Sequence, residues 1–397
     1  MANNNENKIL NVPHLRFPEF TEEWKETKLG KIAEITKGSG ISKDRLSEYG
    51  SPCILYGELY TKYKSEIINE VYSRTELDSS LLVKSKANDV IIPCSGETAI
   101  DISTARCVPF NNILLGGDLN IIRLKNNDGG FFAYQLNGTR KKDIARVAQG
   151  VSVVHLYGEN LKHIRVYHPA IEEQKKITRL LSLIDKRIAT QNKIIEDLKK
   201  LKSAIIEIEY SPKDSYHSHI GGAIVQISKR NKDNHLCNVL SVSNRQGFIK
   251  QSEQFEDRNV ASDDTSNYKI VEKNDFAYNP ARINVGSIAR LTKFETGIVS
   301  PMYICFRTKD CLLPEYLELF FESRNFFYHI QKRLEGSVRL CLSYEELCNI
   351  PIVIPSIEKQ KQVDLHLSKL AQKIDLEMKI LQFVQQQKTY LLHQMFI

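Results

Sequence analysis

The sequence contains one long segment twice, and this repeat most constrains the fold. Around Pro169 the chain reads ENLKHIRVYHPAIEEQKKI, and around Pro355 it reads EELCNIPIVIPSIEKQKQV. The two segments align without a gap at an offset of 186 residues, which also pairs Gly150 with Gly336. A tandem duplication of this length predicts two like units that end in the same element. It also predicts a protein that contacts two sites at a fixed separation.

A heptad pattern of apolar residues follows each of these prolines, over about 171–209 and about 357–396. The positions predicted to form the seam between two helices are Leu181, Ile184, Ile188, Gln191, Ile195, Leu367, Leu370, Ile374, Glu377 and Leu381. A spacing of about 3.5 residues is that of a coiled-coil seam, and a polar residue within the seam fixes its register at some cost in stability. Because two like units tend to dock about a twofold axis, we expect the helices to pack antiparallel.

The predicted helix length matches a feature of DNA. A helix of about 38 residues spans ~57 Å, because the rise is about 1.5 Å per residue. One turn of B-DNA spans ~34 Å. The helix pair therefore has suitable dimensions for a spacer between two DNA half-sites.

Short β-branched and aromatic runs between Gly- and Asn-rich turns occupy the rest of the chain, for example Asp89-Val90-Ile91-Ile92-Pro93. They predict an α+β fold: two mixed α/β domains joined by two long antiparallel helices, in a pseudo-twofold tandem repeat. The predicted segments are an N-terminal arm (1–29), domain 1 (30–168), helix 1 (169–211), domain 2 (212–354) and helix 2 (355–397).

The arm carries Trp24, the single tryptophan of the chain. We interpret Trp24 as an apolar anchor that fixes the arm onto a domain. Thr21 precedes it at a spacing that predicts a short helix, capped by Thr21 and continuing through Trp24.

Composition narrows the class of protein. An apolar fraction of 42% and a charged fraction of 26% are those of a globular chain. The formal charge of +7 permits a polyanionic partner without requiring one. The eight cysteines form no CxxC pair, which argues against a zinc site, and we interpret them as buried thiols in a reducing cytoplasm. No apolar run has the length of a signal or membrane segment, so we expect no membrane attachment.

The sequence lacks an intact catalytic motif of the kinds sought. It contains no phosphate-binding Gly-rich loop, no dinucleotide fingerprint and no Gly-x-Ser-x-Gly elbow. Asn279-Pro280-Ala281-Arg282 resembles the start of an amino-methyltransferase motif, but the second proline and the aromatic residue are absent. A stand-alone DNA nuclease or methyltransferase remains the alternative from the enzyme class, and a purely structural coiled-coil linker is a further alternative.

Loops rich in cations, hydroxyls and amides remain as candidate binding sites in both repeats. Hydroxyls, lysines and backbone amides bind phosphates, whereas arginine pairs with guanine, and asparagine or glutamine with adenine. The candidate DNA-binding residues are Lys37, Ser39, Ser42, Lys43, Arg45, Tyr60, Lys62, Lys64, Ser95, Thr98, Arg245, Gln246, Asn279, Arg282, Asn284 and Arg339. Any one of these loops taken alone is better explained as a solvated turn, but the presence of such loops in both repeats strengthens the case for a binding role.

Over almost its whole length the chain resembles the specificity (S) subunits of Type I restriction–modification enzymes. The resemblance rests on the lead-in 11–20 with Trp24, on the two junctions at Pro169 and Pro355, and on the segment 273–288. The second junction departs from the pattern, with Lys359 where Glu173 stands in the first. This difference predicts that the two junctions contact partners unequally.

The resemblance implies a division of labour. Each domain reads one half of a split DNA target, and the helices set the gap and dock two methyltransferase (modification) subunits. Those subunits bind S-adenosylmethionine, and separate restriction subunits supply ATP- and Mg-dependent translocation and cleavage. The chain itself is then a cytoplasmic, non-catalytic subunit that binds double-stranded DNA and carries no cofactor or metal.

Overall fold

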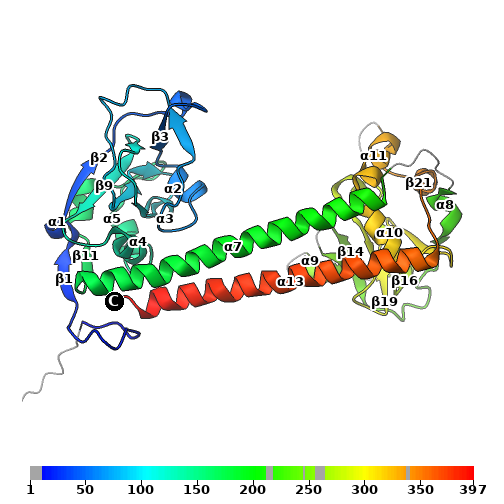
Figure 1. Cartoon of the computed structure of the whole chain (residues 1–397). Coiled ribbons are helices and arrows are strands. Elements are labelled where there is room, and N and C mark those ends of the chain that lie inside the picture. Colours follow the sequence, from blue (N-terminus) through cyan, green and yellow to red (C-terminus); the bar gives the residue numbers. More distant parts are fainter. Residues whose placement is uncertain (1–10, 212–217, 245, 255–263, 337–339) are drawn as a thin grey trace, which may run out of the picture. The chain divides into compact units, whose positions relative to one another are not determined.

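The computed structural model describes residues 11–211, 218–244, 246–254, 264–336 and 340–397. The chain divides into two compact units (Figure 1). Unit 1 comprises Met1–Lys193 and Lys379–Ile397, and unit 2 comprises Ile194–Met378. Each unit therefore contains one mixed domain together with a part of both long helices.

The domain of unit 1 is built on two larger sheets, beside two small two-stranded ones. The first is antiparallel, with the order β2(Ala33–Lys37), β9(Leu119–Leu124), β5(Asp89–Pro93) and β7(Arg106–Val108). The second has the order β4(Ser73–Thr75), β3(Ser51–Ile54) and β8(Leu114–Leu115), and β3 and β8 are parallel. The β-branched run of β5 is buried along its whole length, because it lies inside the first sheet and beneath α4(Gly129–Asn137).

The remaining elements of this domain are short. They are β1(Lys25–Lys28), α1(Leu29–Ile32), η1(Lys43–Arg45), α2(Glu58–Thr61), β6(Ser95–Gly96), α3(Ala99–Ile102), α5(Lys141–Val147), β10(Val154–His155), α6(Gly158–Lys162) and β11(Arg165–His168). β1 pairs with β11, so the strand after the arm closes against the strand that leads into the first long helix.

Unit 2 repeats this plan. Its antiparallel sheet has the order β13(Ile224–Ile227), β20(Ile304–Thr308), β17(Phe276–Tyr278) and β18(Ile288–Arg290). Its second sheet has the order β15(Gly247–Lys250), β14(Val239–Ser243), β19(Thr296–Val299) and β16(Lys269–Glu272), with β14 and β19 parallel. The other elements are β12(Ser218–His219), α8(Ile220–Ala223), α9(Gln251–Gln254), η2(Ile283–Val285), α10(Pro314–Phe321), α11(Arg324–Arg333), α12(Tyr344–Cys348) and β21(Pro351–Ile352).

Backbone conformation confirms the duplication at the 186-residue offset. Asn88 and Asn274 both have positive φ, of 80° and 72°. Gly150 and Gly336 match as well, at 119° and 122°. Glycine and asparagine adopt this region more readily than other residues, so both repeats place permissive residues at the same turns.

Side-chain contacts repeat in the two units as well: Asp89 and Asp275 are 186 residues apart, and their arginine partners Arg123 and Arg307 are 184 residues apart. Asp89 accepts two hydrogen bonds from Arg123, at 2.9 and 2.7 Å. In the second unit Asp275 accepts two from Arg307, at 2.6 and 3.0 Å. Both aspartates are almost fully buried and cross-link neighbouring strands of the antiparallel sheet in a bidentate manner.

The junction glutamines Gln174 and Gln360 explain why the junction sequence occurs twice. Each donates a side-chain hydrogen bond of 2.9 Å to the carbonyl of the preceding proline, Pro169 or Pro355. Each also accepts a backbone hydrogen bond from the turn before a domain helix, at 2.9 and 2.8 Å. Both side chains are buried, so every junction joins its long helix rigidly to its domain.

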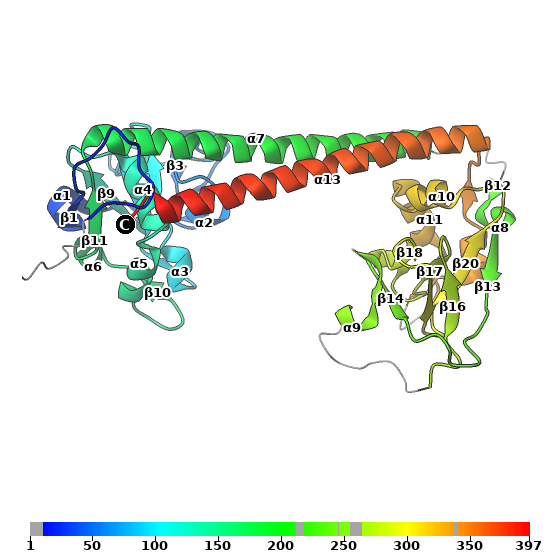
Figure 2. The same ribbon diagram turned by 90° about the horizontal axis from the view of Figure 1, so that it is seen from below.

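The long helices are α7(Ile171–Glu209) and α13(Ile357–Gln394), and they run antiparallel, as predicted. Within unit 1, the C-terminal end of α13 lies beside the first turns of α7 (Figures 1 and 2), and Lys388 Nζ is 2.6 Å from Asp185 Oδ1. Within unit 2, Ile206 near the end of α7 shares a core with Val363 and Leu367 at the start of α13. All ten predicted seam residues are buried or half-buried in the structure.

Two expectations need correction. Residues 21–24 form no helix, because Trp24 donates its backbone N–H to Asn11 O at 2.8 Å and the chain enters β1 at the next residue. The cysteines are all free thiols, but Cys237 and Cys311 are exposed because they lie in connecting loops rather than in strands. Trp24 is an anchor, as expected: it is 2% exposed and packs on Phe131 at 5.5 Å between ring centroids.

The described residues lack two further features. No described helix is long and apolar enough to cross a membrane. No cluster of three or more His, Cys, Asp or Glu residues suited to a metal ion occurs in the described part of the chain.

Candidate nucleic-acid interface

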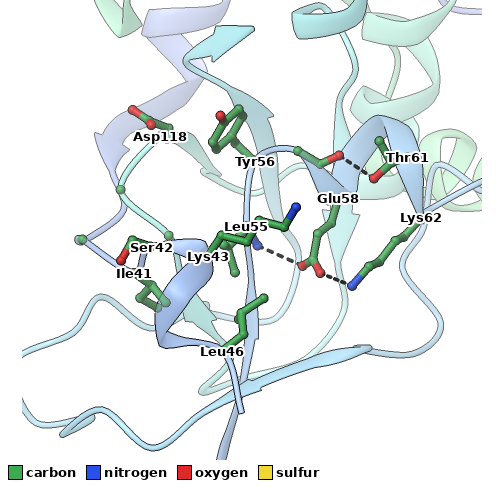
Figure 3. A pocket seen from close by; sticks show the side chains of 14 residues that line it. Ile41, Ser42, Lys43, Leu46, Leu55, Tyr56, Glu58, Thr61, Lys62 and Asp118 are labelled. Atoms are coloured by element: carbon green, nitrogen blue, oxygen red, sulfur yellow. Dashed lines mark hydrogen bonds and ion pairs between the residues drawn. The ribbon is translucent and has the colours of Figure 1, made fainter. Parts of the chain in front are cut away.

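A hollow of about 900 Å³ opens in unit 1 at the carboxyl ends of the parallel strands β3 and β8 (Figure 3). We call it hollow 1. Three of the candidate residues, Ser42, Lys43 and Lys62, line it. In sheets with parallel strands, ligands bind outside the carboxyl ends of those strands, so the position of this hollow favours a binding role.

Lys62 is already engaged inside hollow 1. The buried carboxylate of Glu58 accepts hydrogen bonds from Lys62 Nζ at 2.6 Å and from the Leu55 backbone N–H at 3.0 Å (Figure 3). Ser73 donates a further hydrogen bond to the same carboxylate. The Lys43 side chain is exposed and forms no hydrogen bond or ion pair with another described residue, so its ammonium is the one available for a phosphate or a base.

Close backbone packing shapes the wall of hollow 1. A Cβ atom on Gly38 would lie 2.0 Å from the carbonyl oxygen of Gly116, so only glycine allows these two loops to meet. The hydroxyl of Ser39 accepts the Val83 backbone N–H at 2.8 Å. This candidate residue therefore holds the wall in place in the free chain.

The other candidates of unit 1 lie outside the lining of hollow 1. Lys37, Arg45, Lys64 and Thr98 are exposed, whereas Tyr60 and Ser95 are half-buried. Arg45 is 3.6 Å from Asp44, and Lys64 donates to the Thr61 carbonyl at 3.0 Å. Thr98 caps α3 by accepting the Asp101 backbone N–H at 3.1 Å. Their proposed contacts with DNA stay predictions.

A second hollow, of about 420 Å³, opens in unit 2 at the carboxyl ends of β14 and β19. We call it hollow 2, and the candidate residues Asn279 and Arg282 line it. The Arg282 side chain is exposed and forms no hydrogen bond or ion pair with any other residue that the structure describes. Its backbone is held at both ends of the turn, since Arg282 N–H donates to Asn279 O at 3.0 Å and Ser287 N–H donates to Arg282 O at 3.1 Å.

Asn279 has a different environment. It is 7% exposed, and its Oδ1 accepts the Ala281 backbone N–H at 3.1 Å, which stabilises the turn. Gln246 is exposed and Asn284 half-buried, and neither lines hollow 2. Arg245 and Arg339 lie outside the described residues, so their roles also stay predictions.

The two hollows occupy equivalent positions in the two repeats. In unit 1 the parallel register pairs Ile54 with Leu115, and hollow 1 begins directly after both residues. In unit 2 it pairs Leu240 with Val299, and hollow 2 begins at the same place. Sequence reasoning did not find the lining residues Tyr56, Asp118, Asn244 and Gln251. In the sequence, the only feature that could have pointed to these four residues is their place close to the end of a predicted strand.

The junctions differ in one internal contact. Glu173 is 1% exposed and accepts two hydrogen bonds from Arg16 of the arm, at 2.8 and 2.7 Å, and one from Trp24 Nε1 at 3.4 Å. The hydrogen bond to Glu173 raises the pKa of Arg16 above its usual value. Lys359, at the equivalent place, is exposed and lies 3.5 Å from Glu209. In the described part of the chain an arm covers only the first junction, where Glu173 binds it.

This contrast yields a matched pair of variants. Glu173→Ala should destabilise unit 1 by roughly 1.5–3 kcal/mol, because bonds to a charged group are lost where the arm covers the junction. Lys359→Ala should change the free energy of unfolding by less than about 0.5 kcal/mol. Urea unfolding measures both changes. Trp24 fluorescence monitors it for Glu173→Ala, and circular dichroism monitors it for Lys359→Ala. Equal effects would show that the arm contact does not stabilise unit 1.

Comparison with known proteins agrees with this architecture. Residues 21–200 match the family described as the Type I restriction modification DNA specificity domain. The Type I restriction enzyme MjaVIII specificity subunit of Methanocaldococcus jannaschii is 24% identical over 198 residues, which are 49% of this chain and 42% of that protein. The putative MjaX specificity subunit of the same organism is 31% identical over 99 residues, 24% of this chain and 23% of that one. The matches thus span less than half of each relative.

Solved structures share the fold. The Type I S subunit from M. genitalium superposes with a TM-score of 0.61 at 15% identity, covering 97% of this chain and 99% of that one. A chain from a structural study of complex assembly and conformational transition in a type I R–M system gives 0.55 at 12% identity, covering 93% and 96%.

The chain is therefore similar, over residues 21–200, to the Type I restriction modification DNA specificity domain, and it shares its tandem two-domain fold with a solved Type I S subunit.

Proposed function

We propose that this chain is the DNA sequence-recognition subunit of a Type I restriction–modification complex, in which each domain reads one half of a bipartite target. The observation that carries the proposal is the pair of equivalent hollows with different linings. Hollow 1 presents Ser42 and Lys43, whereas hollow 2 presents Arg282 among amides and hydroxyls. Equivalent sites with different chemistry are what two different half-sites require.

Exposed apolar stripes on the long helices support the docking of modification subunits. The stripe residues are Leu183, Ile194, Leu201 and Ile208 on α7, and Leu365, Leu376, Phe383 and Tyr390 on α13. The spacings are 11, 7 and 7 residues on both helices, and such spacings keep residues on one helix face. The stripe residues are 39% to 74% exposed, so each helix presents a row of apolar side chains that is available to a partner protein. The proposed occupants are two methyltransferase subunits.

The chemistry of the complex belongs to these partners in our proposal. The methyltransferase subunits bind S-adenosylmethionine, and restriction subunits contribute ATP- and Mg-dependent translocation and cleavage. The chain itself is non-catalytic, carries no cofactor and works in the cytoplasm, where it meets double-stranded DNA.

Co-expression with the cognate Type I modification subunit tests this function. We expect a stable complex and methylated adenines confined to one bipartite sequence, whereas the pure chain alone transfers no methyl groups. Methylation by the chain alone would favour the stand-alone methyltransferase. A complex that methylates without any sequence preference would favour a purely structural linker.

The long helices should also act as a ruler. Inserting one heptad into each of α7 and α13 lengthens the pair by ~10 Å, since the rise is about 1.5 Å per residue. That distance corresponds to about three base pairs at ~3.4 Å each. The methylated sequence should keep both halves and gain a gap about three base pairs longer. An unchanged gap in an active, folded insertion variant would contradict the ruler.

A further inference from the structure

We propose that hollow 2 is a base-reading recess in which the side-chain amides of Asn244 and Gln251 bind the edge of an adenine in one half of the DNA target. This inference rests on the proposed function, because it requires the second domain to bind duplex DNA.

The two amides are available for such a contact. Asn244 is exposed directly after β14, and Gln251 is half-buried at the start of α9. Both line hollow 2, and neither side chain forms a hydrogen bond with another described residue. An amide with a free donor and a free acceptor makes the two-bond contact with N6 and N7 of adenine. Asn279 differs, because its Oδ1 is already occupied by the Ala281 backbone N–H.

The charge of hollow 2 suits a polyanion. Among its described lining residues, Arg282 is the one charged residue, and no carboxylate is present. Hollow 1 differs, since its lining contains the carboxylates of Glu58 and Asp118 as well as two lysines. A cation beside free amides allows the phosphate backbone to approach while the amides contact the base edge.

The recess is also preformed. Ser287 Oγ donates to Val242 O at 3.1 Å, and Tyr303 OH accepts the Val242 backbone N–H at 3.3 Å. Gly286 has a φ of +89°, and a Cβ on it would lie 3.7 Å from Asn244 Cβ. The turn that carries Arg282 is therefore fixed against β14 beside Asn244. A preformed site loses less conformational entropy on binding.

The test uses the full chain in complex with its modification subunit and maps the sequence context of methylated adenines in genomic DNA. In Asn244→Ala and Gln251→Ala we expect discrimination at one or two A·T positions of one half-site to fall about fivefold to a hundredfold. The other half-site should stay unchanged, because hollow 1 reads it. Gln331→Ala, an exposed glutamine on α11 outside the hollow, should behave as the unmodified chain.

Isosteric variants cover the case in which an alanine variant does not fold. Asn244→Asp and Gln251→Glu keep the shape but remove the donor, and a carboxylate accepts from cytosine N4. These variants should shift the preference from adenine towards cytosine at the same position. An unchanged motif in the isosteric variants overturns the proposal. So does a uniform loss of binding to all sequences with a smaller salt dependence, since that indicates phosphate contacts. A complex of the unmodified chain that methylates without sequence preference would instead refute the proposed function itself.

Discussion

Replacing Lys388 with methionine should destabilise unit 1 by about 3–5 kcal/mol, because two buried carboxylates then lose their common cation. Lys388 Nζ lies 2.6 Å from Glu66 Oε2 and 2.6 Å from Asp185 Oδ1, and all three side chains are at most 15% exposed. Tyr134 OH donates to the other oxygen of Asp185 at 2.7 Å. Methionine has a similar volume, so the expected loss reflects the stranded charges and not a cavity.

Lys388, Glu66 and Asp185 form a buried charge cluster, in which the pKa values of Glu66 and Lys388 are both raised. Burial raises the pKa of Glu66 above its usual value, and the attraction of Lys388 opposes that rise. Burial works against the charged form of Lys388 as well, but the two carboxylates outweigh it and raise the pKa of the ammonium. Without Lys388 the pKa of Glu66 should rise further. Adding Glu66→Gln to Lys388→Met should therefore recover part of the lost stability.

Trp24 fluorescence during urea unfolding measures this effect, because the single tryptophan lies in the core of unit 1. Lys202→Met is the matched control, since Lys202 occupies the equivalent position on α7, and circular dichroism follows its unfolding because Lys202 lies in unit 2. Its partner Glu322 lies at 2.6 Å but is 45% exposed, so the loss should stay below about 1 kcal/mol. A loss below about 1 kcal/mol for Lys388→Met as well would show that the cluster does not stabilise the docking of domain 1.

Replacing Arg282 with alanine should relax recognition of one half-site only. The loss of a two-bond contact between arginine and guanine costs about 1–3 kcal/mol of discrimination, or roughly fivefold to a hundredfold in preference. Arg282 is the exposed guanidinium of hollow 2, and its turn is fixed by backbone hydrogen bonds on both sides. The affected base should therefore lie in the half-site that domain 2 reads.

Mapping of methylated adenines again supplies the measurement. Arg324→Ala is the matched control, because Arg324 is exposed on α11 and does not line hollow 2. Equal methylation of both half-sites in Arg282→Ala, with the original base preference, would show that Arg282 does not read DNA. An equal loss of methylation at all sequences would indicate that Arg282 contacts a phosphate and not a base.

The sequence alone determined the elements that depend on local or repeated patterns. The heptads predicted α7 and α13, and the repeat predicted two like units; the structure adds that both units attach to their long helix through an equivalent glutamine, Gln174 or Gln360. These predictions are correct because the spacing of apolar residues determines helix packing within a few turns, and because the same pattern occurs in both copies of the repeat. The prediction of a short helix at Thr21 is wrong, because the burial of Trp24 in the core stabilises a non-helical backbone more than one capping residue stabilises a helix.

Only the tertiary structure decided which distant residues meet. β3 and β8 are separated by about sixty residues, yet their parallel pairing creates hollow 1, and no local pattern encodes that pairing. Lys202 and Lys388 are alike in sequence, but only Lys388 is enclosed by two carboxylates. Glu173 acquires its partner from Arg16, 157 residues earlier in the chain. Such contacts depend on long-range strand pairing and on the docking of helix ends, which the whole chain establishes together and no single segment specifies.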